Sequence, residues 1–101
     1  MSFQQLLDED RRLCVLRCLW EADGRSLNED LLLRMVGFYR LGVISADDLR
    51  GYMTWLEGQR LVTLEKLPVP SGVLWVATLT GTGVAVAEGK RWPGIAQPAA
   101  R

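Results

Sequence analysis

The amino-acid sequence lacks histidine, long apolar runs and net charge. Without histidine, the commonest general base is missing, and so are the Ser-His and Cys-His pairs that activate nucleophiles. No apolar run approaches the roughly 18 to 20 residues that cross a bilayer. Twelve basic side chains balance twelve acidic ones, so no overall field attracts nucleic acid. These absences argue against an enzyme and against a membrane protein.

Cysteine is also scarce, with only Cys14 and Cys18 in 101 residues. The two residues are four apart on a predicted helix and therefore share one face of it. The chain has no basic-then-apolar leader, so we expect it in a reducing cytoplasm, where a disulfide is not expected. A zinc site normally needs four ligands, and Asp or Glu would have to supply two of them. We predict buried structural thiols, with a metal or redox role as the alternative, and we expect no metal ion or cofactor.

Three amphipathic segments predict helices in residues 2–22, 29–40 and 45–59. Ser26 or Asn28 can cap the second helix, and Ser45 with Asp48 has the spacing of a capping box for the third. The first helix is apolar nearly all round in its second half, "CVLRCLW". Such a helix lies at the centre of the core or pairs with a second copy of itself, so a homodimer through the first helix is the alternative.

Two segments rich in β-branched and aromatic residues, "LVTLEKL" and "VLWVATLT", flank the turn sequence "PVPSG" and predict a β-hairpin. In the second segment Trp75 alternates with Ala77 and Leu79, which places it on the core side. The extended segment "RSL" is a candidate to pair with one hairpin edge. Thr80 can cap a last helix at residues 81–88. We predict a single domain in residues 1–90 and a loosely ordered tail in residues 91–101.

This order of elements predicts an α+β, mainly helical fold with a three-helix core, a two-stranded hairpin and a short C-terminal helix. The stretch "DDLRGYMTWLEGQRLVTLE" resembles the part of winged helix-turn-helix proteins where the recognition helix leads into the wing. The stretch "ATLTGTGVAVAEG" resembles the signature that closes the wing and opens the last helix. The whole chain is similar to small winged-helix proteins of Mu-like phages and prophages that are labelled ArsR-type regulators.

The resemblance implies a phage- or prophage-encoded DNA-binding protein, a transcriptional regulator in the cytoplasm of the bacterial host. Arg50 and Thr54 are then expected to reach toward bases of duplex DNA, and Arg40, Arg60 and Lys66 toward phosphates. ArsR-type metal sensors carry their thiolates in the recognition helix, where this sequence has no cysteine, so we expect no metal site. No pattern in the sequence predicts a small-molecule substrate.

The charge of the third helix predicts that any DNA binding is weak. Asp47 and Asp48 lie in its first turn, where they stabilise the helix dipole and repel phosphate. Residues 45–66 carry three basic and four acidic side chains. A monomer of this kind neutralises few phosphates, so its salt dependence is shallow and a dimer with two half-sites is needed for useful affinity.

The same helix also predicts a different function, a protein–protein interaction module with no intrinsic DNA affinity. Its core-facing residues leave Gly51, Trp55 and Gly58 on the opposite side. Each glycine costs a helix up to about 1 kcal/mol relative to alanine, which suggests a packing reason, and tryptophan is enriched at interaction hot spots. The alternative for Trp55 is a place at the periphery of the core, packed on the first or second helix.

Overall fold

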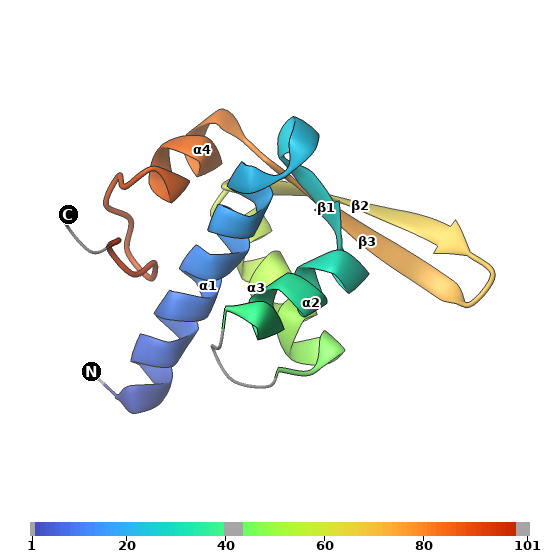
Figure 1. The fold of residues 1–101 in the computed structure, drawn as a ribbon, viewed down its shortest axis with the longest axis horizontal. Helices are drawn as coiled ribbons and strands as arrows, with labels where there is room; N and C mark the ends of the chain where they lie inside the picture. Colours follow the sequence, from blue (N-terminus) through green and yellow to red (C-terminus); the bar gives the residue numbers. More distant parts are fainter. Residues whose placement is uncertain (1, 40–43, 99–101) are drawn as a thin grey trace.

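The computed structural model describes residues 2–39 and 44–98 of the chain (Figure 1). Within these residues it has four α-helices and a three-stranded antiparallel sheet with strand order β1-β3-β2. The elements in chain order are α1 (Phe3–Glu21), a 3₁₀ turn (Asp23–Arg25), β1 (Ser26–Asn28), α2 (Glu29–Phe38), α3 (Ala46–Gly58), β2 (Val62–Val69), β3 (Gly72–Leu79) and α4 (Gly81–Ala87). The predicted α+β, mainly helical fold is confirmed at this level.

Side-chain caps explain where the helices begin. Ser45 and Asp48 form the predicted capping box, with Asp48 N donating to Ser45 Oγ at 3.0 Å and Ser45 N donating to Asp48 Oδ2 at 3.3 Å. Asn28, and not Ser26, caps α2. Thr80 caps α4 as predicted. The second helix ends at Phe38, earlier than predicted, and the next residue is its C-cap.

The hairpin forms as predicted, with Val62 opposite Leu79 and Val69 opposite Gly72. The extended segment before α2 also pairs with it, since β1 lies antiparallel to β3. Ser26, the unused cap candidate, instead shares a hydrogen bond of 2.8 Å with the Thr78 hydroxyl across these strands. The hairpin projects beyond the helices, whereas the chain after α4 returns along α1 (Figure 1).

Helix α1 is the centre of the core. Its second half is buried on several sides, and it contacts α2, α3, α4 and the sheet. This explains why its sequence is apolar nearly all round, while pairing with a second copy stays a prediction. Both cysteines are free, buried thiols, as predicted. In the described ranges, every helix is too short or too polar to cross a membrane. The buried α1 residues are Cys14, Val15, Leu16, Cys18 and Leu19.

The tail has no helix or strand between residues 91 and 98, yet it is attached to the domain. Ile95 is only 8% exposed and belongs to the hydrophobic core. Trp92 Nε1 donates to Gln59 Oε1 at 3.1 Å, and Ala96 N donates to the Glu9 carbonyl at 3.3 Å. The tail was predicted to be loosely ordered, and its described part lacks helix and strand but packs on the domain through these contacts.

Candidate interaction surface

Helix α3 presents the two faces that the sequence predicted. Leu49, Met53 and Leu56 are buried in the core. Gly51 and Gly58 lie on the exposed face, together with Asp47, Asp48, Thr54 and Glu57. The exposed face therefore combines three carboxylates with small side chains, and the one cation of the helix, Arg50, lies between the two faces.

The guanidinium of Arg50 is bound inside the domain. It donates to both carboxylate oxygens of Glu29, from Nε at 2.8 Å and from Nη2 at 2.9 Å, and Nη2 also donates to the Val73 carbonyl at 2.9 Å. Its carbon Cζ lies 4.7 Å from the ring centroid of Trp75. Arg50 was predicted to reach toward DNA bases. In this arrangement such a contact requires the loss of charge-assisted hydrogen bonds.

Glu29 is the buried carboxylate at the centre of this arrangement, with only 7% of its surface exposed. Hydrogen bonds from Arg50 lower the pKa of Glu29 below its usual value against the opposing effect of burial, and the backbone N–H of Trp75 adds to the lowering. The same ion pair raises the pKa of Arg50. Glu29 therefore stays ionised and holds α2, α3 and the hairpin together.

Glu29 and Arg50 also complete the edge of β3 beyond the end of β1. Strand β1 stops opposite Val76, and the next groups along this part of β3 are bound by side chains. Trp75 N donates to Glu29, and the Val73 carbonyl accepts from Arg50. An edge satisfied in this way is closed to pairing with another strand. No local pattern in the amino-acid sequence signals this role, because Glu29 and Arg50 are 21 residues apart.

The other residues predicted to contact DNA do not form one basic surface. Lys66 Nζ lies 4.3 Å from the ring centroid of Trp75, on the indole that Arg50 also contacts. Thr54 is exposed, but its hydroxyl donates to the Arg50 carbonyl at 2.8 Å. Arg60 is exposed in the turn after the C-terminal end of α3, whereas Arg50 lies nearer the N-terminal end of that helix. Arg40 lies outside the described residues.

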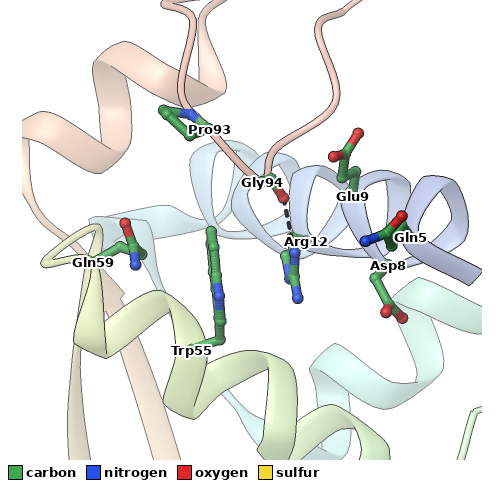
Figure 2. A pocket seen from close by; sticks show the side chains of 8 residues that line it. All are labelled: Gln5, Asp8, Glu9, Arg12, Trp55, Gln59, Pro93 and Gly94. Atoms are coloured by element: carbon green, nitrogen blue, oxygen red, sulfur yellow. Dashed lines mark hydrogen bonds between the residues drawn. The ribbon is translucent and has the colours of Figure 1, made fainter. Parts of the chain in front are cut away.

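Trp75 packs against the core as predicted, and Trp55 takes the peripheral place that was the alternative for it. Trp55 is half-buried between α1 and α3. Cζ of Arg12 lies 4.1 Å from its ring centroid, and Gly94 of the tail touches the ring edge (Figure 2). By contrast, a Cβ atom at Gly51 would meet nothing within 4 Å among the described residues. The domain's own packing therefore does not require glycine at position 51.

Two adjoining hollows run between α1 and α3 and share Asp8, Arg12 and Trp55. We call them together the α1–α3 groove. One part, of about 500 Å³, reaches Gly51 and the first turn of α3. The other, of about 660 Å³, reaches the tail at Gly94 (Figure 2). The full lining is Gln4, Gln5, Asp8, Glu9, Arg11, Arg12, Asp47, Asp48, Gly51, Tyr52, Trp55, Gln59, Pro93 and Gly94.

Acidic side chains outnumber basic ones in the α1–α3 groove, and the two arginines are engaged. Arg11 donates to the Tyr52 hydroxyl at 3.2 Å, and Arg12 donates to the Gly94 carbonyl at 3.1 Å. The Tyr52 hydroxyl in turn donates to Asp8 at 2.6 Å, which lowers the pKa of Asp8. Burial, with the hydrogen bond to Asp8, raises the pKa of Tyr52. The groove therefore offers carboxylates to a ligand, with its cations already in use.

Comparison with known proteins relates the chain to phage proteins. No family model matches it. It is 40% identical over 97 residues to gp26 of Escherichia phage Mu, an uncharacterized protein, with 95% of both chains covered. It is also 43% identical over 67 residues to an uncharacterized protein of Haemophilus influenzae, covering 66% of this chain and 64% of that protein. By its length and identity of match to the phage Mu protein, the chain belongs to the gp26 family of Mu-related phage proteins.

Proposed function

We propose that the chain is a winged-helix domain. The order α1-β1-α2-α3-β2-β3 supports this assignment, as does the pairing of a short first strand with the hairpin. In this assignment α2 and α3 form the helix-turn-helix, α3 is the recognition helix and the β2–β3 hairpin is the wing. The ion pair between Glu29 and Arg50 fixes the wing strand β3, at Val73 and Trp75, against both helices.

We further propose that this phage protein acts as an interaction module that binds a basic segment of a partner protein. One observation carries the proposal: Arg50, the sole cation of α3, is taken up by Glu29, while Asp47, Asp48 and Glu57 on the same helix are exposed. A surface of this charge repels phosphate and attracts lysine and arginine side chains. The acidic α1–α3 groove beside it extends the same surface.

Gly51 supports contact with a protein backbone. In a helix interior, glycine costs up to about 1 kcal/mol relative to alanine, and the described residues leave open space where its side chain would be. Gly51 lies beside Trp55 at the rim of the groove, and because it has no side chain, the backbone of a partner can approach α3 closely there. Tryptophan beside such a surface is suited to be an interaction hot spot.

Peptide binding tests this proposal. A fluorescent amphipathic helix of Lys and Leu serves as the probe, with the same helix carrying Glu in place of Lys as the control. We expect the basic peptide to bind and the acidic one not to bind, with binding weakened between about 50 mM and about 500 mM salt. Equal binding of the two peptides, or binding of neither, contradicts the proposal.

Substitution at glycine locates the binding surface. Gly51→Leu is expected to block the peptide and to leave the fold intact, because space is open at this position. Gly37→Leu is the matched control, since Gly37 is also an exposed helical glycine at which an added Cβ atom would meet no described residue within 4 Å, but it lies in the last turn of α2. If both variants bind the peptide as the natural protein does, α3 is not the binding surface.

Duplex DNA is the second candidate partner, favoured by the winged-helix arrangement and by the two cations, Arg50 and Lys66, beside Trp75 of the wing. A homodimer through α1 would supply two such domains. Fluorescence anisotropy with a duplex of about 30 base pairs at low salt tests it. Binding that Lys66→Ala and Arg60→Ala together abolish supports DNA recognition. Binding no stronger than that of an acidic control protein excludes duplex DNA as the partner.

A further inference from the structure

The segment from Trp92 to Ala96, which we call the strap, is bound to both walls of the α1–α3 groove. At one end the Trp92 indole donates to Gln59 at the end of α3, and at the other Ala96 N donates to the Glu9 carbonyl of α1. Between them Ile95 inserts into the core and is 8% exposed. The strap is therefore a fitted part of the domain that follows the last helix (Figure 1).

Gly94 fits the strap to Trp55 for two independent reasons. Its φ of +86° lies in the left-handed region, which favours glycine. A Cβ atom here would also lie 2.6 Å from Cζ2 and 2.8 Å from Cη2 of Trp55. Its carbonyl accepts from Arg12 Nη1, so the turn is held over the stacked pair of Arg12 and Trp55 (Figure 2).

One polar group beside the strap is unsatisfied. Arg12 Nε is buried and has no hydrogen-bond partner among the described residues. A buried donor without an acceptor is less stable than the same donor in water. The hydrogen bond from Arg12 Nη1 to the Gly94 carbonyl does not remove this penalty. The closed position is therefore held by Ile95 and a few hydrogen bonds.

Opening of the strap changes the α1–α3 groove at its Trp55 end. Pro93 and Gly94 form one wall of the larger hollow, and the ring edge of Trp55 is in contact with Gly94. Without this wall the indole of Trp55 becomes accessible to a ligand. It then adds an apolar surface beside the acidic one that begins at Gly51, because both hollows border Trp55.

We propose that the strap is an autoinhibitory contact, which covers the Trp55 end of the surface that binds a basic partner segment. The identity of that segment rests on the proposed function. An apolar side chain of the partner segment competes with the chain's own strap for the Trp55 ring. When a site is open in only a fraction of the molecules, its apparent Kd equals the Kd of the open site divided by that fraction. Release of the strap therefore raises the affinity without any new contact to the partner.

Gly94→Val in the full chain tests the release. The added side chain meets the Trp55 ring, so we expect the Trp92 indole N–H, bound to Gln59 in the closed state, to exchange with solvent at least about tenfold faster by NMR. Gly89→Ala is the matched control, because Gly89 has a φ of +125° but open space around it. If Gly94→Val does not fold, Ile95→Ala replaces it. An indole that exchanges as slowly as in the natural protein contradicts the inference.

Titration of the same variants with the Lys/Leu peptide tests the consequence. We expect Gly94→Val to bind at least about threefold more tightly than the natural protein, and Gly89→Ala to bind as the natural protein does. An open strap with unchanged peptide affinity overturns autoinhibition and leaves the proposed function standing. Binding by the natural protein that is strengthened in the open variant supports both. Absence of binding in every variant, with the strap shown to be open, rejects the proposed function and the inference with it.

Discussion

Two arginine–tryptophan stacks flank α3, and they differ in what else binds the arginine. At the first, the Arg50 site, Cζ lies 4.7 Å from the Trp75 centroid, and the guanidinium binds Glu29 and the Val73 carbonyl. At the second, the Arg12 site, Cζ lies 4.1 Å from the Trp55 centroid, which is closer. Here, among the described residues, the guanidinium has the carbonyl of Gly94 as its hydrogen-bond acceptor, and Nε has none.

The difference shows that the stack by itself does not decide how firmly an element is held. A cation–π contact contributes about 0.5 to 1 kcal/mol at an exposed site, whereas hydrogen bonds to a buried carboxylate are stronger and directional. The Arg50 site therefore fixes the wing against α2 and α3. At the Arg12 site the strap is held through one backbone carbonyl, and the nearby carboxylate of Asp8 acts on Arg12 only through space, so the strap is the element that we expect to open.

The largest effect is expected from Glu29→Gln, which keeps the size of the side chain and removes its charge. Arg50 then loses its counter-charge and the Trp75 N–H loses a charged acceptor. We expect the free energy of unfolding to fall by about 2 kcal/mol, which corresponds to a melting temperature lower by roughly 10 °C. Glu65→Gln, on the exposed hairpin, is the control. A loss of unfolding free energy as small as that of the control would mean that the ion pair does not hold the wing in place.

Acid is expected to reproduce part of this loss. The folded-state pKa of Glu29 is lowered, so its contribution is complete above the ordinary glutamate value of about 4.3 and is lost as the pH falls through the folded-state pKa. The stability difference between the natural protein and Glu29→Gln should therefore shrink to zero below that range. Chemical denaturation at a series of pH values measures it. A difference that is constant with pH would exclude the ion pair as its cause.

A smaller effect is expected from Ile95→Ala at the strap. A buried isoleucine normally costs about 2 to 5 kcal/mol when it is cut back to alanine. In this variant we expect the strap to open, so that no cavity remains in the folded protein, and the loss of free energy of unfolding is limited to about 1 kcal/mol. Leu32→Ala, at a fully buried position of α2, is the control and should show the full loss. Equal losses in urea denaturation would mean that the strap is as firmly held as the core.

The smallest effect is expected from Arg12→Leu. The substitution removes one hydrogen bond to Gly94 and the stack on Trp55, but it also removes the unsatisfied Nε. We expect the free energy of unfolding to stay within about 0.5 kcal/mol of the natural value. Arg50→Leu leaves the buried Glu29 carboxylate without its cation and should destabilise the fold far more than Arg12→Leu does. Similar losses at both arginines would erase the distinction between the two sites.

Local patterns in the sequence predicted most of the fold. The capping box at Ser45 and Asp48 marks the start of α3, and strand alternation places Ala77 and Leu79 in the core. The short segment before α2 pairs with β3 as the pattern suggested. These predictions succeed because caps, turns and periodic burial depend on residues a few positions apart. The exposed face of α3 was predicted for the same reason.

The use of each charged and aromatic side chain was decided only by the tertiary structure. The sequence determined that α3 carries one arginine and one tryptophan, but the partners of these residues are distant in the chain. Arg50 binds Glu29, which is 21 residues away. Trp55 contacts Arg12 of α1 and Gly94 of the tail, which are 82 residues from each other. Whether a cation is free for a ligand depends on which groups the folded chain brings within hydrogen-bond distance. That proximity arises from packing around α1, and no local pattern encodes it.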